Sequence, residues 1–101
     1  MICRGGENIS PSEVEAALEK HPHVAQAVVL GLADDRLGES VAACVRFIPG
    51  AGGDFLTLEG WLRERIAPFK VPRNWRAVKE FPVTPTGKIQ RHRLLPTFEE
   101  S

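Results

Sequence analysis

Hydrophobic positions near the start of the chain recur with the spacing of an amphipathic helix. Val14, Ala17 and Leu18 lie at i, i+3 and i+4, which gives the segment one apolar face. The helix is predicted over residues 11–20, because Pro22 cannot continue it. The charged residues of this segment are expected to point to water; they are Glu13, Glu15, Glu19 and Lys20.

Three signals mark the start of this helix. Ser10 and Glu13 have the spacing of a capping box, and Pro11 stands at the first helical position. Ile9 and Val14 have the spacing of a hydrophobic staple. The helix is therefore predicted to begin at Pro11.

Two apolar runs rich in β-branched residues follow, at residues 24–32 and 41–48. The polar segment 34–39 between them has turn chemistry, so the two runs are predicted to be adjacent antiparallel strands. Residues 75–81 are expected to form a third strand.

A second helical pattern lies between the second and third strands, where four apolar residues repeat with helical spacing: Leu58, Trp61, Leu62 and Ile66. A turn-forming loop at residues 82–87 and a short helix at residues 89–95 complete the chain. The predicted fold class is therefore α+β, a small antiparallel sheet of about three strands flanked by helices.

Composition and length narrow the class of protein. The 101 residues are 43% hydrophobic with no net charge, which is typical of a globular chain forming a single domain over residues 1–101. No apolar run approaches the roughly 20 residues of a membrane span, and no signal peptide is recognised. Cys3 and Cys44 are expected to be reduced thiols of a cytoplasmic protein, and Cys44 to fill the core.

Charge is unevenly distributed along the chain. Residues 1–62 carry four Lys or Arg and nine Asp or Glu, whereas residues 63–93 carry nine and two. This basic strip, residues 63–93, suits phosphate on a nucleotide or a nucleic acid, and it equally suits a solvated surface. The sequence lacks the aromatic-studded strand of RNA-binding modules, and no GxxG clamp lies in a helical hairpin.

Lys88 is the first candidate for chemistry. It does not complete a phosphate loop, because Pro82 stands where the first glycine is needed and Ile89 where Ser or Thr is needed. What remains is a lysine on a loop stiffened by Pro85 and Gly87. A mobile charge on a fixed base suits phosphate or carboxylate oxygens; the alternative is a solvated surface lysine.

The second candidate is the stretch Gly5-Gly6-Glu7-Asn8 before the first helix. Two residues without Cβ let the backbone approach a ligand closely, and the alternative is a plain tight turn.

Neither the histidines nor the tryptophans are expected to bind a ligand. His21 and His23 have no third metal-ligating residue nearby, so no metal site is expected. Trp61 and Trp75 lie on predicted core positions and are expected to pack.

Taken together, these stretches resemble a known family. Residues 5–15, GGENISPSEVE, are similar to the signature of the adenylate-forming superfamily, which includes acyl-CoA and aryl-CoA synthetases, luciferases and the adenylation domains of peptide synthetases. Residues 21–24, 28–31, 34–39, 69–73 and 85–89 are similar to the family's further C-terminal segments in the same order. The chain most resembles the C-terminal domain of an AMP-forming acyl-CoA synthetase.

The resemblance implies that this chain is a mobile lid whose large N-terminal domain is absent, so the fragment alone is expected to be inactive. In the first step of the family's reaction a carboxylate and ATP form an acyl-adenylate and pyrophosphate. Lys88, on the motif loop of Pro85, Thr86 and Gly87, would contact the carboxylate and the α-phosphate. It would also be a target for a lysine acetyltransferase and deacetylase.

In the second step the domain rotates and a thiol, usually that of CoA, displaces AMP. The resemblance implies that Gly5, Gly6, Glu7 and Asn8 then flank the pantetheine passage. ATP and CoA would be substrates, and Mg²⁺ would be bound mainly by the absent domain. The acyl substrate, a fatty, aromatic or alicyclic acid, would be selected there as well.

Two other functions are weighed against this one. An adenylation domain would pass the acyl group to the thiol of a carrier protein instead of CoA. A small nucleic-acid-binding module would use the basic strip, but it leaves the glycine motif unexplained, so no nucleic-acid partner is expected.

Overall fold

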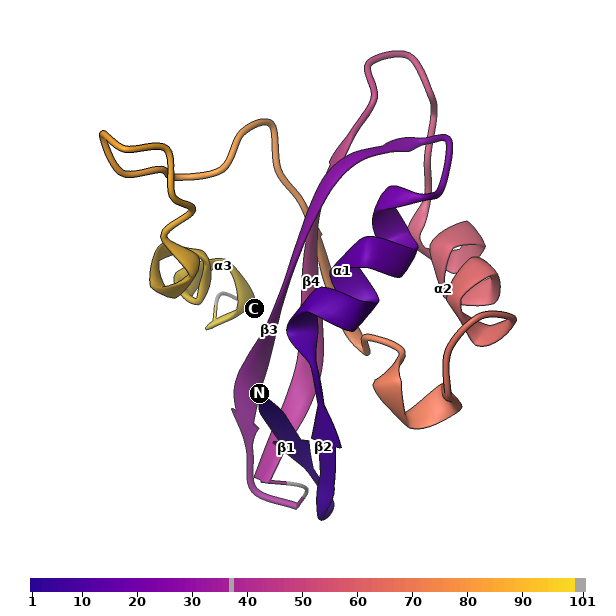
Figure 1. Ribbon diagram of the computed structural model, residues 1–101, viewed down its shortest axis with the longest axis vertical. Coiled ribbons are helices and arrows are strands. Elements are labelled where there is room, and N and C mark those ends of the chain that lie inside the picture. The colour runs from indigo at the N-terminus through magenta and orange to yellow at the C-terminus, as the bar shows by residue number, and fades with distance from the viewer. Residues whose placement is uncertain (37, 100–101) are drawn as a thin grey trace.

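The computed structural model describes residues 1–36 and 38–99, and builds a sheet with helical segments on both faces (Figure 1). In chain order the elements are β1 (Ile2–Arg4), β2 (Glu7–Ile9), α1 (Pro11–Glu19), β3 (Val24–Asp34), β4 (Gly38–Phe47), α2 (Phe55–Arg63), the 3₁₀ helix η1 (Pro68–Lys70), β5 (Asn74–Ala77), the 3₁₀ helix η2 (Arg91–Leu94) and α3 (Pro96–Glu99). No helix in these ranges has the length and apolar character that crossing a bilayer requires.

The sheet is organised around β4. Its order is β2-β1-β4-β3, and β5 also pairs with β4. β3 and β4 are antiparallel from the Val24–Phe47 pair to the Asp34–Gly38 pair. β5 runs parallel to β4 and pairs Ala42–Val45 with Asn74–Ala77.

Alternation along β3 and β4 creates two apolar layers, one on each face of the sheet. On one face, Val29 and Val45 pack with Val14 and Leu18 of α1 and Leu62 of α2. On the other face, a second cluster forms between the strands and the C-terminal segment; it contains Val28, Leu30, Ala42, Cys44, Phe81 and Leu94. The helices α1 and α2 thus cover one face, and η2 and α3 cover the other (Figure 1).

The α+β class is confirmed, and the three predicted strands are present. The sheet is larger than the predicted three strands, because β1 and β2 form a short hairpin that adds two more. β5 ends at Ala77, four residues before the predicted end, and pairs in parallel. The parallel pairing follows from α2 and η1, which give the connection from β4 the length of a crossover.

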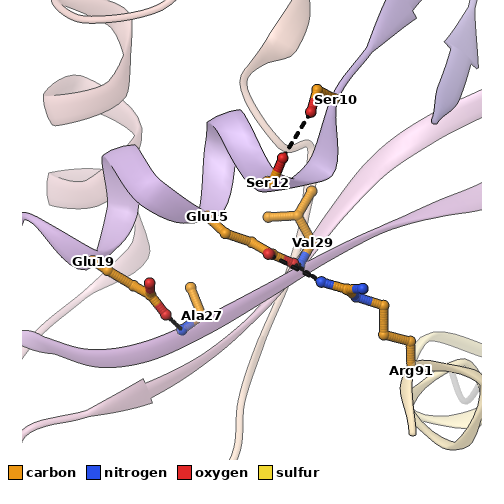
Figure 2. Close-up of polar contacts among 7 residues, drawn as sticks. All are labelled: Ser10, Ser12, Glu15, Glu19, Ala27, Val29 and Arg91. Atoms are coloured by element: carbon orange, nitrogen blue, oxygen red, sulfur yellow. Dashed lines mark hydrogen bonds and ion pairs between the residues drawn. The ribbon is translucent and has the colours of Figure 1, made fainter. Parts of the chain in front are cut away.

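The helix α1 begins at Pro11, as predicted, but the predicted capping box does not form. The Ser10 side chain makes no bond to the helix backbone; its hydroxyl lies 2.9 Å from that of Ser12 (Figure 2). The Glu13 carboxylate instead accepts bonds of 2.8 and 3.0 Å from the Lys70 ammonium.

Two of the glutamates predicted to point to water bond to the backbone of the sheet; Glu15 is half-buried, whereas Glu19 is exposed as predicted. The Glu15 carboxylate accepts a 2.8 Å bond from the Val29 N–H, and the Glu19 carboxylate accepts a 3.1 Å bond from the Ala27 N–H (Figure 2). Both donors belong to β3, which lies at an edge of the sheet, where alternate backbone N–H groups lack a strand partner. The helix supplies the acceptors that a further strand would otherwise provide.

The helix α2 begins three residues before Leu58, the first residue of the predicted apolar repeat, and ends three residues before its last residue, Ile66. Asp54 is its N-cap, and its carboxylate accepts bonds from the Thr57 N–H at 2.8 Å and the Thr57 hydroxyl at 3.1 Å. These bonds lower the pKa of the Asp54 carboxyl. At the end of the chain, η2 and α3 stand where a single short helix was predicted.

Cys44 lies on the central strand and has no solvent-exposed surface, as predicted for a core residue. Its burial raises the pKa of the thiol to about 11. Cys3 is also free and is exposed at the β1–β2 hairpin. The two thiols therefore differ strongly in accessibility.

This difference predicts the order in which the thiols react. At pH 8, Cys3 should be alkylated by iodoacetamide within minutes, whereas Cys44 stays unmodified, since its burial blocks access and only about one thiol in a thousand is ionised there. Peptide mass spectrometry measures each site separately. In denaturant both should react alike. Equal native rates would contradict the burial of β4.

Candidate active-site surfaces

Lys88 lies on a hairpin that the chain makes with itself. Val83 and Ile89 form an antiparallel bridge, and the Thr84 N–H donates to the Lys88 carbonyl at 2.8 Å. The Gly87 N–H donates to the Thr84 carbonyl at 2.8 Å, which closes a turn with Pro85 at its second position. Gly87 has a φ of 88°, a conformation that favours glycine, so the residue types fix the turn.

The Lys88 side chain is exposed at the tip of this hairpin. Its backbone N–H is held by the Thr84 hydroxyl at 3.1 Å, whereas within residues 1–36 and 38–99 its ammonium has no hydrogen-bond or ion-pair partner. Among the described residues, the turn of Pro85, Thr86 and Gly87 thus presents an unpaired positive charge.

Gly5 and Gly6 form the two-residue turn between β1 and β2. Arg4 pairs with Glu7 across the turn, and both glycines have positive φ, 56° and 87°. Two positive φ values are the requirement of a type I′ hairpin, which explains glycine at both positions. A Cβ added to Gly6 would meet nothing within 4 Å, so its absence leaves the surface of the turn open.

Glu7 and Asn8 follow this turn and are exposed. The side-chain oxygen Oδ1 of Asn8 accepts a 3.1 Å bond from the Cys3 thiol on the facing strand. The Cys3 N–H in turn donates to the Glu39 carboxylate of β4 at 2.9 Å. The hairpin is therefore tied to the central strand.

The two candidate surfaces lie at opposite ends of the molecule (Figure 1). The Gly5–Gly6 turn lies at the bottom of the view, and the gold loop that carries Lys88 lies at the upper left. The structure therefore does not bring Lys88 together with Gly5, Gly6, Glu7 and Asn8.

A cationic pocket beside the Gly5–Gly6 turn was not anticipated. It has a volume of about 200 Å³ and is lined by Arg4, Asp34, Arg36 and Arg73. An adjoining hollow of about 370 Å³ shares Arg4 and Arg73 and adds Arg63. No spacing rule groups Arg4 and Arg36 with Arg73, because they come from three segments that lie far apart in the sequence: β1, the turn between β3 and β4, and the connection from η1 to β5.

His21 and His23 contact each other, and His21 also packs against Trp61. The His21 Nδ1 accepts a 3.0 Å bond from the His23 N–H, and the His21 ring packs edge-on against Trp61 at 4.8 Å. Burial, with smaller contributions from His23 and Arg65, lowers the pKa of His21. Among the described residues, no three metal-ligating side chains gather at one place.

The basic strip is not a continuous cationic surface in the folded chain. Lys70 pairs with Glu13 at 2.8 Å and Arg91 with Glu15 at 2.7 Å. Arg76 donates to the Thr97 carbonyl at 2.8 Å. Two glutamates from the acidic first half of the chain therefore neutralise two positive charges of the strip.

Known proteins are similar to this chain in sequence and in fold. Residues 13–88 match the family described as the AMP-binding enzyme C-terminal domain. A Danio rerio protein named medium-chain acyl-CoA ligase ACSF2, mitochondrial, is 44% identical over 99% of this chain, and a long-chain-fatty-acid–CoA ligase of Bacillus subtilis is 45% identical over 100%. An acyl-CoA synthetase of Brucella canis superposes with a TM-score of 0.89 at 37% identity over 98% of this chain.

These relatives are much longer proteins. The chain spans 16% of the Danio rerio protein, 18% of the Bacillus subtilis protein and 19% of the Brucella canis protein. The likeness nevertheless covers nearly all of this chain in both sequence and fold. The chain belongs to the family of AMP-binding enzyme C-terminal domains.

Proposed function

We propose that this chain is the C-terminal lid of an AMP-forming acyl-CoA synthetase and supplies Lys88 to the adenylation step. The observation that carries the proposal is the exposed ammonium of Lys88, which has no partner among the described residues, on a hairpin whose shape is fixed by Pro85 and Gly87. The names of the relatives support the reaction class, since both are ligases of a fatty acid and CoA.

Lys88 would act on the charges that meet when the carboxylate attacks the α-phosphate of ATP. Both reactants are anions, so a cation held between them offsets their repulsion and stabilises the charge that develops at phosphorus. The carboxylate oxygen forms the new bond to phosphorus while the bond to pyrophosphate breaks. An ammonium on a fixed loop serves this step best, because little reorganisation is needed as the charge develops.

The second surface would serve the transfer to a thiol. The open Gly5–Gly6 turn, with Glu7 and Asn8, would line the passage for the pantetheine arm, and the pocket of Arg4, Arg36 and Arg73 suits the phosphates of CoA. The CoA thiol forms the thioester as AMP leaves with the electrons of the acyl–phosphate bond. Supplying free CoA or a carrier protein to the enzyme separates the two acceptors.

A larger N-terminal domain would hold ATP, Mg²⁺ and the acyl pocket. The activity therefore belongs to the longer enzyme that carries this domain. We predict that this longer enzyme is cytoplasmic, because Cys3 and Cys44 are both free thiols.

Lys88→Ala should suppress the first half-reaction alone. Loss of one preorganised contact to the transition state lowers its rate by about 10² to 10³. ATP–pyrophosphate exchange in the longer enzyme measures this step, and thioester formation from supplied acyl-adenylate should stay near the wild-type rate. Lys79→Ala, which removes another exposed lysine outside the hairpin, is the matched control. Equal losses in both half-reactions would overturn the role of Lys88.

Gly6→Leu should have the opposite effect and slow thioester formation from supplied acyl-adenylate while exchange continues. Gly6→Ala is the control, since it shares the strain of a positive φ, roughly 1 to 2 kcal/mol, without a side chain that reaches beyond Cβ. An alanine variant as slow as the leucine variant would show that turn strain, not blockage of a passage, causes the loss.

Arg73→Gln should raise the KM for CoA by about 10-fold or more, because one charge-assisted hydrogen bond to phosphate is lost. The exchange reaction should not change. Arg46→Gln is the comparison, since the Arg46 guanidinium contacts Gln26 away from the pocket. A wild-type KM in Arg73→Gln would exclude the cationic pocket from CoA binding.

A further inference from the structure

The hairpin that carries Lys88 is rigid within itself, but its direction depends on how its base is attached. Val83 and residues 85–88 are exposed, so the tip does not pack on the domain. Phe81 and the partly buried Ile89 join the second core cluster. Apolar contacts of this kind hold the base of the hairpin against the core. Because they are not directional, they do little to set the direction in which the hairpin projects.

A polar contact at the base of the hairpin sets the direction in which the hairpin projects. Arg91 stands three residues after Lys88, at the start of η2. Its guanidinium nitrogen lies 2.7 and 3.0 Å from the two oxygens of the Glu15 carboxylate (Figure 2). Within the described ranges, no other ion pair ties residues 82–93 to the rest of the domain.

Glu15 is the fixed member of this pair. It stands in the middle of α1, its side chain is only 14% exposed, and its carboxylate already accepts the Val29 N–H at 2.8 Å. The helix and the edge of the sheet thus hold the carboxylate from both sides. Arg91 reaches it from the layer on the opposite face of the sheet (Figure 2).

The segment between Lys88 and Arg91 is held by backbone contacts, so it allows little relative movement of the two residues. Ile89 is bridged to Val83, and the Gln90 N–H donates to the Pro82 carbonyl at 2.8 Å. Both arms of the hairpin and Arg91 are therefore one connected unit. A shift of Arg91 would be transmitted to the base of the hairpin, and a displacement of about 1 Å at a reacting group is enough to lower a rate by up to 10².

We propose that Glu15 is a positioning residue for Lys88: its carboxylate holds Arg91 and thereby sets the direction of the hairpin in the adenylation step. This inference rests on the proposed function of Lys88. It assigns a role to a glutamate that touches neither substrate, and it predicts that the charge of Glu15, beyond its bond to β3, matters for the rate.

Glu19 provides a matched comparison within the same helix. It lies one turn after Glu15, and its carboxylate accepts the Ala27 N–H of the same strand edge at 3.1 Å. No arginine pairs with it in the described part of the chain. The two glutamates thus share the contact to β3 and differ in the contact to the Lys88 unit.

The experiment uses the longer enzyme with four variants: Glu15→Gln, Glu19→Gln, Arg91→Gln and Arg91→Lys. Glutamine keeps an oxygen for the backbone N–H and removes the charge.

Glu15→Gln and Arg91→Gln should each lower the kcat of ATP–pyrophosphate exchange by about 10-fold, with the KM for ATP and the melting temperature near wild type. Thioester formation from supplied acyl-adenylate should be unaffected. Arg91→Lys, which keeps the charge, should recover most of the loss.

A double variant, Glu15→Gln with Arg91→Gln, should be no slower than either single variant, since both remove one interaction. Additive losses, equal losses in both half-reactions, or the same loss in Glu19→Gln would overturn the inference in favour of a general structural role. Exchange lost in Lys88→Ala but normal in Glu15→Gln would overturn this inference alone. Normal exchange in both variants would overturn the proposed role of Lys88 together with it.

Discussion

The structure depends on the pairing of β4 with three other strands. Its residues Val41–Val45 are fully buried, because β3 lies on one side, β1 and β5 lie on the other, and apolar layers cover both faces. A strand buried in this way must satisfy all its backbone groups within the sheet. Each candidate surface is attached to it: the Gly5–Gly6 turn through β1, and the Lys88 hairpin through the second core cluster.

Local sequence signals predicted most of the elements because each has a local physical cause. Pro11 fixes the start of α1, and the β-branched runs form β3 and β4. The hairpin of β1 and β2 was missed as a pair of strands, since three residues on each side of a turn show no periodicity. The Gly5-Gly6 dipeptide between them was the available signal.

The candidate site was predictable where one segment carries it and unpredictable where several segments meet. Lys88 and its turn residues lie within four positions, so their motif is visible in the sequence. The pocket of Arg4, Arg36 and Arg73 and the pair of Glu15 with Arg91 join residues from distant segments. Helical periodicity placed Glu15 toward water, because it takes no account of an edge strand whose N–H groups need acceptors.

Under the proposed function, the placement of the two surfaces has a consequence for how the two steps would alternate. Both are attached to one sheet, the turn through β1 and the hairpin through the second core cluster and the ion pair of Arg91 with Glu15, so moving the hairpin relative to the turn would require breaking the contacts at its base. The hairpin of Lys88 and the turn of Gly5 and Gly6 therefore move together, and presenting one end to a reaction centre withdraws the other. A rotation of the whole domain achieves this without any internal rearrangement. The ion pair between Glu15 and Arg91 fits such a rotation, because it holds the hairpin of Lys88 in place relative to the sheet.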